Sequence, residues 1–170
     1  SYPSGSCAFK LMPLVFVRTD DMRTAQWENI DFKRAEWKFN VSKADEPFIV
    51  PLSNQAIEIL KEIKQFTGDG KYVFASDRSK TGYISQNTML DALRAVGVSK
   101  EEMTIHGFRA MARTILHERL DIDPYALEHQ LAHRVPDALG SAYNRTKFLE
   151  QRKKAMQVWA DYLDELRATK

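Results

Sequence analysis

A change in hydrophobic period near Ser53 is the feature that most restricts the fold of this chain. Before it, three short runs rich in Trp, Phe, Ile and Val are separated by polar turns, at residues 26–32, 37–41 and 48–52. Such runs are typical of strands. After Ser53, apolar residues recur at helical spacing through most of the remaining chain. The sequence therefore predicts an α+β, mainly α domain with a small three-stranded antiparallel sheet near its N-terminus.

Local signals predict where the helices lie. An apolar run at 8–17 contains a proline, which indicates a distorted helix. Thr19 before two aspartates marks the start of another helix, and Ser53 and Ser85 are expected to cap two more. Residues 1–170 are expected to form one domain, with residues 1–6 disordered or foreign to the natural protein. Further helices are predicted at about 106–119, 124–133, 136–146 and 148–167.

Composition narrows the class of protein without identifying it. The longest apolar run is seven residues, at 11–17, whereas a membrane-spanning helix needs about 18. The single cysteine, Cys7, cannot form an internal disulfide. The net charge of +2 alone argues only weakly for a nucleic-acid partner. The positive charge is local, however, because residues 134–154 hold six Lys or Arg against two acids.

Chemically reactive side chains gather in four places. In chain order these are Arg18 after the apolar helix, Lys43 between two expected strands, His106 with Arg109, and His133 with Tyr143. His106 and Arg109 are three residues apart, so a helix would place both on one face. Arginine suits phosphate oxygens, and histidine moves a proton near neutral pH. Taken singly, each place also fits an ordinary role, such as a helix-end cation, a solvated turn lysine or a packing tyrosine.

A metal site is the alternative for one of these places. His129 and His133 are four residues apart, a spacing used by pairs of zinc ligands on a helix. In the metalloprotease pattern a glutamate follows the first histidine, but here Gln130 stands at that position. No histidine downstream offers a third ligand. The sequence therefore favours a site without a metal.

Taken together, the four places resemble the catalytic domain of the tyrosine recombinases, the phage integrase family, and look most like integrases of satellite phages and genomic islands. The resemblance extends from about residue 8 to residue 166. It is carried by R-T-D-D-M at 18–22, similar to an R-x-x-E-L box, by Lys43 before I-V-P-L-S, by H-G-F-R at 106–109, and by L-A-H and A-Y-N-R at 131–133 and 142–145. Asp21 departs from the first box, since it replaces a glutamate.

The resemblance implies a site-specific DNA recombinase that integrates or excises a mobile element through a 3′-phosphotyrosyl intermediate. Tyr143 would be the nucleophile. The other implied catalytic residues are Arg18 and Arg109 on the phosphate oxygens, His133 on the same phosphate, Lys43 as general acid and His106 assisting the proton transfer from tyrosine. Asp21 would support the site, and Arg134, Arg145 and Lys147 would contact DNA. The resemblance implies no metal and no other cofactor.

The implied partners are double-stranded DNA attachment sites. The protein would be a monomer without DNA and a homotetramer on DNA. Accessory DNA-bending or excisionase proteins are also implied, as is a location with the nucleoid in the cytoplasm of a bacterial host and no membrane partner. The stripe of Met156, Trp159, Leu163 and Leu166 on the last helix fits either the chain's own core or exchange with a neighbouring protomer. Core-binding and arm-binding domains are expected to be absent from this chain. Two alternatives are an inactive DNA-binding remnant and a type IB topoisomerase-like enzyme.

Overall fold

The computed structural model describes residues 2–41, 46–95, 97, 105–130 and 141–169, some of them by their backbone only. In chain order its elements are α1 (Ser4–Val15), α2 (Thr19–Arg23), the short 3-10 helix η1 (Trp27–Asn29), β1 (Ile30–Asp31), β2 (Glu36–Val41), β3 (Glu46–Pro51), α3 (Asn54–Thr67), α4 (Gln86–Ala95), α5 (Ile105–Glu118), α6 (Pro124–Gln130) and α7 (Ser141–Ala168). None of these helices is long and apolar enough to span a membrane.

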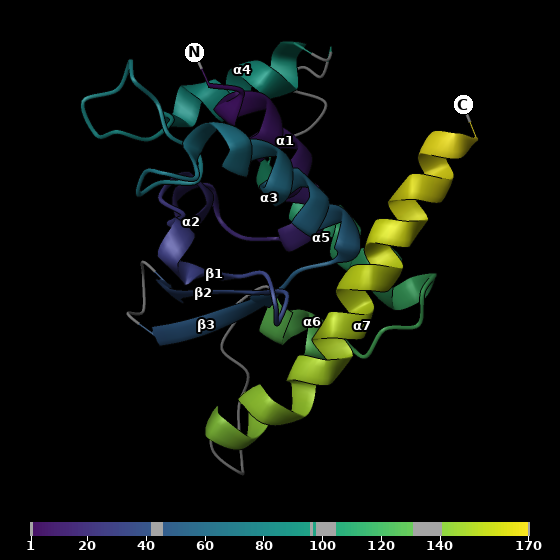
Figure 1. The fold of residues 1–170 in the computed structure, drawn as a ribbon. Helices are drawn as coiled ribbons and strands as arrows, with labels where there is room; N and C mark the ends of the chain where they lie inside the picture. Colours follow the sequence, from purple (N-terminus) through teal and green to yellow (C-terminus); the bar gives the residue numbers. More distant parts are fainter. Residues whose placement is uncertain (1, 42–45, 96, 98–104, 131–140, 170) are drawn as a thin grey trace.

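The described part confirms the predicted fold class. The three strands form one antiparallel sheet in the order β1-β2-β3, and helices make up most of the rest (Figure 1). Trp37 on β2 pairs with Val50 on β3, and both side chains are buried in the main core. Ser53 caps α3 as predicted, because its Oγ accepts the backbone N–H of Ala56 at 3.2 Å.

The prediction of a full strand over residues 26–32 is wrong. Only Ile30 and Asp31 pair with β2, and the residues before them form η1. The reason is a competing set of contacts near the end of α3. The Trp27 indole N–H donates to the Thr67 carbonyl at 2.9 Å, and the Trp27 backbone N–H donates to the Lys71 carbonyl at 3.0 Å. These bonds hold the segment against α3 rather than in the sheet.

Helix α1 supplies many residues of the main core and begins earlier than predicted. Its buried face packs on α3, α4 and α7. The Ser4 hydroxyl, which is buried, donates to the Ala75 carbonyl at 2.7 Å. This bond fixes the first turn of α1, so residues 4–6 are part of a helix.

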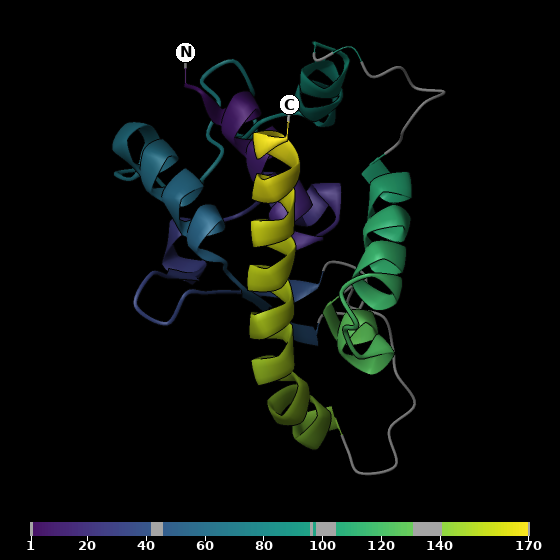
Figure 2. The same cartoon turned by 90° about the vertical axis from the view of Figure 1, so that its right-hand side faces the viewer.

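Helix α7 is one continuous helix of 28 residues. The predicted break between 136–146 and 148–167 is therefore wrong from Ser141 onward, and no proline or glycine interrupts the helix there. Figure 2 shows α7 running along the molecule between α3 on one side and α5 on the other. Met156 and Trp159, from the stripe that could have served a neighbouring protomer, are instead buried in the chain's own core.

Trp159 makes α7 part of the core, and its loss is expected to be costly. The side chain is 1% exposed, its indole N–H donates to the Pro13 carbonyl at 2.8 Å, and its ring lies 5.8 Å from that of Phe16. We expect Trp159→Ala to lower the free energy of unfolding by about 3–5 kcal/mol, measured by urea denaturation. Leu166→Ala is the control on the same helix, because Leu166 is 46% exposed. A loss below about 1 kcal/mol for Trp159→Ala would contradict this packing.

Candidate active site

The end of α1 determines where Arg18 lies. A helix leaves its last carbonyls without partners inside the helix, and here side chains from other helices supply them. Trp159 of α7 donates to the Pro13 carbonyl, and Gln130 of α6 donates to the Val15 carbonyl at 3.2 Å. Phe16 then adopts a left-handed backbone with φ 56°, which redirects the chain. The segment that leads to Arg18 is thus fixed by contacts from α6 and α7.

Arg18 and Asp21 belong to the short helix α2. Arg18 is its N-cap residue, with extended backbone angles, and the Arg18 carbonyl accepts the Met22 N–H at 3.0 Å. Thr19 is therefore the first residue of the helix rather than its cap. The Arg18 side chain is half-buried, and Asp21 is buried. A carboxylate in the first turn is also favoured by the helix dipole.

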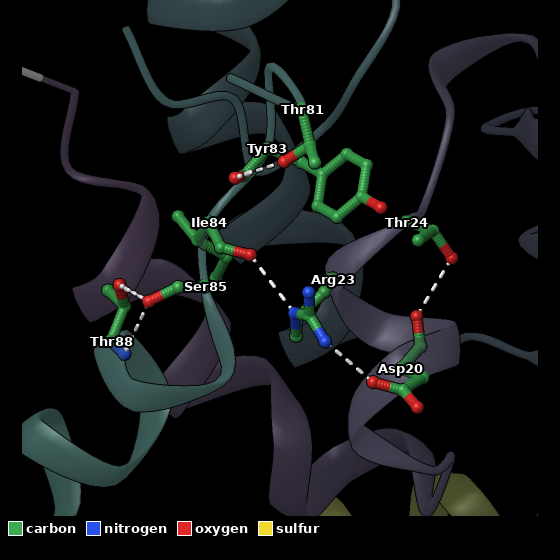
Figure 3. A network of polar contacts seen from close by, with 8 residues as sticks. All are labelled: Asp20, Arg23, Thr24, Thr81, Tyr83, Ile84, Ser85 and Thr88. Atoms are coloured by element: carbon green, nitrogen blue, oxygen red, sulfur yellow. Dashed lines mark hydrogen bonds and ion pairs between the residues drawn. The ribbon is translucent and has the colours of Figure 1, made fainter. Parts of the chain in front are cut away.

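A network around Arg23 holds α2 in place (Figure 3). The Arg23 Nε donates to the Ile84 carbonyl at 3.0 Å, its Nη1 forms an ion pair of 2.6 Å with Asp20, and its guanidinium lies over the Tyr83 ring at 5.5 Å. These contacts join α2 to the segment before α4. Arg23 is therefore an anchor for the helix that carries Arg18 and Asp21.

Arg109 lies on α5 and comes from the opposite half of the chain. It is 9% exposed. Burial lowers the pKa of its guanidinium, the positive charge of Arg18 lowers that pKa further, and the negative charge of Asp21 raises it. Because such effects fall with distance, Arg18 and Asp21 lie within electrostatic range of Arg109. The structure thus brings together three of the residues that the sequence singled out.

This cluster has one more positive charge than negative charge. Guanidinium groups keep their proton in proteins and present a planar set of N–H donors. Arg18 and Arg109 repel each other, and the burial of Arg109 adds a desolvation cost. An anion bound between them would relieve both effects, and a phosphate has the oxygens to accept from both. The arrangement is suited to bind a phosphate group.

The other predicted site residues are placed only in part. Lys43, His133 and Arg134 lie outside the described residues. Four others are placed by their backbone alone: His106 on α5, and Tyr143, Arg145 and Lys147 in the first two turns of α7. The helix confirms that His106 stands one turn before Arg109. Because His129 is described by its backbone only, the pair it forms with His133 is not placed either. Among the side chains that the structure does describe, no three potential metal ligands gather.

Sequence reasoning missed Gln130 and Arg152, two buried polar residues that contact each other. Gln130 is 2% exposed and Arg152 is 4% exposed, and the Arg152 Nε donates to the Gln130 Oε1 at 3.0 Å. A signal for Arg152 was available. It stands four residues before Met156 and seven before Trp159 on the buried stripe of α7, where an apolar residue is the usual choice.

The chain is similar to known proteins over most of its length. A family model described as the phage integrase family matches residues 4–150. The chain is 39% identical over 173 residues to the integrase of Enterobacteria phage P4, covering 92% of this chain and 39% of that protein. It is 34% identical over 161 residues to the integrase of Shigella phage Sf6, covering 93% of this chain and 41% of that protein. It thus spans about two fifths of the length of these relatives.

Two solved structures share the fold. An integrase from mycobacterium phage Brujita superposes with a TM-score of 0.70 at 16% identity, covering 92% of this chain and 52% of that one. The XerA recombinase superposes with a TM-score of 0.59 at 16% identity, covering 89% of this chain and 64% of that one. At this low identity the superpositions show a shared fold.

Proposed function

Because this chain belongs to the phage integrase family, we propose that it is the catalytic part of a site-specific DNA recombinase that integrates or excises a mobile element. The observation that carries the proposal is the cluster of Arg18, Asp21 and Arg109, built from both halves of the chain and suited to a phosphate. Tyr143, which the sequence motifs mark as the nucleophile, is in the first turn of α7.

The proposed reaction exchanges one phosphate ester for another. The Tyr143 oxygen attacks a DNA phosphorus, a bond forms between them, and the bond from phosphorus to the 5′-oxygen breaks. The products are a 3′-phosphotyrosyl link and a free 5′-hydroxyl. Because the ester is conserved in the covalent intermediate, a 5′-hydroxyl from another strand reverses the step without ATP.

The remaining proposed roles follow from where protons move and where charge develops. A phenol has a pKa near 10, so Tyr143 needs help to lose its proton at neutral pH, and His106 is the proposed helper. Lys43 would donate a proton to the leaving 5′-oxygen. Arg18 and Arg109 would stabilise the charge that develops on the phosphate oxygens, assisted by a hydrogen bond from His133. Asp21 would orient Arg18 or the histidines and would not itself react. The arginines neutralise the phosphate, so the mechanism requires no divalent ion.

The proposed substrate is the double-stranded DNA of two attachment sites. Arg134, Arg145 and Lys147 would contact backbone phosphates, because all three flank the nucleophile in the basic stretch at 134–154. Recombination joins four strands, so a homotetramer on the DNA is proposed, assisted by accessory DNA-bending or excisionase proteins. Residues 1–170 would act as one catalytic domain beside further domains that hold the core and arm DNA. The place of action is the host nucleoid.

The proposal is tested by trapping the covalent complex. The natural full-length protein is incubated in chelator with a nicked duplex that carries the attachment core of the element encoding it. We expect a 5′-labelled strand to become attached to protein on a denaturing gel, because the phosphate stays on the 3′ end of that fragment. The released fragment should carry a 5′-hydroxyl that polynucleotide kinase phosphorylates.

Three other outcomes would contradict the proposal in different ways. Absence of any covalent product would indicate a remnant that binds DNA without cutting it. Cleavage that chelator abolishes would support a metal site using His129 and His133. Relaxation of supercoiled plasmid that lacks the attachment core would indicate a topoisomerase-like activity.

A further inference from the structure

Arg152 joins three elements that lead to predicted catalytic residues. Its Nε donates to Gln130 at the end of α6, its Nη2 donates to the Ile49 carbonyl of β3, and its guanidinium lies over the Phe48 ring at 4.8 Å. Gln130 in turn donates to the Val15 carbonyl of α1. One side chain of α7 is thus tied to α6, β3 and, through Gln130, the end of α1.

The chemistry of this contact set indicates a role beyond stability. Burial lowers the pKa of Arg152 to about 10, so the guanidinium is still charged at neutral pH. Its partners in the described part of the chain are an amide oxygen, a carbonyl oxygen and an aromatic ring, and none of them is an anion. A buried charge is a weak source of stability, since an apolar side chain of similar volume often serves as well. A planar group that donates in fixed directions does specify the position of its helix.

The location of Arg152 on α7 indicates that it positions the start of this helix. Among the side chains of α7 that the structure describes, Arg152 is the first buried one, and Phe148 to Gln151 before it are partly or fully exposed. The neighbouring Lys153 pairs at 3.3 Å with Glu36, a buried residue of β2. Figure 1 shows the start of α7 extending past the sheet. Residues 152 and 153 therefore form the attachment of α7 to the sheet on the side of Tyr143.

Tyr143 stands nine residues before Arg152 on the same helix, a distance of about 13 Å at a rise of about 1.5 Å per residue. At that distance, a tilt of about 5° about the attachment would move the helix at Tyr143 by about 1 Å. A displacement of about 1 Å between reacting groups can cost about 100-fold in rate.

We propose that Arg152 is a positioning residue that, through Gln130 and the Ile49 carbonyl, sets the place of the nucleophile Tyr143 against the phosphate-binding arginines. This inference rests on the proposed function, because it assigns Tyr143 the attack on DNA. Arg152 acts through the helix and touches neither the DNA nor the reacting atoms.

The test uses variants that keep the fold. Arg152→Lys retains the charge and much of the length, but a single ammonium group lacks the fork that reaches both acceptors. Gln130→Met removes the acceptor on α6 and conserves its volume. Gln157→Met is the matched control, because Gln157 is also a polar anchor of α7: it accepts the Asn54 N–H at 2.9 Å and donates to Gln55, farther from Tyr143. All three variants are expected to lower Tm by a few degrees.

The readouts are the single-turnover rate of covalent complex formation at saturating nicked duplex and the Kd for that DNA. We expect Arg152→Lys to lower the rate by about 30-fold with a Kd within about 3-fold of wild type. Gln157→Met should keep the rate within about 2-fold. The double variant Gln130→Met with Arg152→Lys should lose less than the product of the two single losses, because both variants remove the same Arg152–Gln130 contact.

A substrate with sulfur in place of the bridging 5′-oxygen distinguishes a defect in the attack by tyrosine from a defect in protonation of the leaving group. Thiolate leaves without protonation, so Lys43→Ala should recover on this substrate, whereas Arg152→Lys should stay slow because its defect lies in the attack. Recovery of Arg152→Lys would overturn the inference, and so would a wild-type rate in Arg152→Lys or an equal loss in Gln157→Met. If the wild-type protein forms the complex but the variants do not show the expected rates, only the role of Arg152 is overturned. If wild type forms none, the proposed function falls with it.

Discussion

Replacement of Arg109 by methionine is expected to slow DNA cleavage by about 1,000-fold and to leave the fold intact. Arg109 is buried within electrostatic range of Arg18 and Asp21, where a bound phosphate would accept hydrogen bonds from its N–H groups. Removing one donor from a preorganised site for developing negative charge costs about 100- to 1,000-fold in rate, and Arg109 also carries a full charge. The measurement is the single-turnover rate of covalent complex formation on the nicked duplex.

The fold should tolerate this change because, in the DNA-free protein, burial and the charge of Arg18 lower the pKa of Arg109 more than the charge of Asp21 raises it. Its burial and the neighbouring Arg18 both lower its pKa, so both disfavour the charged form that methionine eliminates. We expect the urea midpoint to stay close to that of wild type. Arg113→Met is the control, since Arg113 lies one turn farther along α5 with an exposed side chain. A rate for Arg109→Met within about 3-fold of that control would contradict a role on the phosphate.

The elements that the sequence predicted well are those decided by local signals. The cap at Ser53 needs only a hydroxyl three residues before a free N–H, and the apolar pairs of β2 and β3 follow from strand alternation. Residues 26–32 have the composition of a strand, but Trp27 finds its partners at the end of α3 and after it. No pattern within the segment could reveal contacts that depend on how α3 packs.

The residues of the candidate site also differ in how well the sequence predicts them. The motifs mark Arg18 and Arg109 by resemblance, and in the structure the charge of Arg18 lowers the pKa of Arg109. Gln130 and Arg152 carry no motif, and each alone looks like a polar residue on a helix surface. Their contacts depend on how α1, α6, α7 and β3 pack around them. A charged residue on an otherwise apolar stripe is the signal that sequence reasoning can use in such cases.

Replacement of Tyr143 by phenylalanine is expected to abolish the covalent complex completely. The change removes the single oxygen that forms the bond to phosphorus, and no other group at this position on α7 can replace it. DNA affinity should stay within about 3-fold of wild type, because backbone phosphates held by basic side chains dominate affinity. Tyr162→Phe is the matched control on the same helix, where the Tyr162 ring packs on Trp159 at 5.8 Å and its hydroxyl accepts from Arg119 at 3.4 Å.

The most direct test of the central claim is to locate the bond itself. The trapped complex is digested with protease and nuclease, and the peptide that retains a nucleotide is sequenced by mass spectrometry. We expect a 3′-nucleotide on Tyr143 in wild type and in Tyr162→Phe, and no linked peptide in Tyr143→Phe. A nucleotide on any other residue, or a complex that persists in Tyr143→Phe, would contradict this claim.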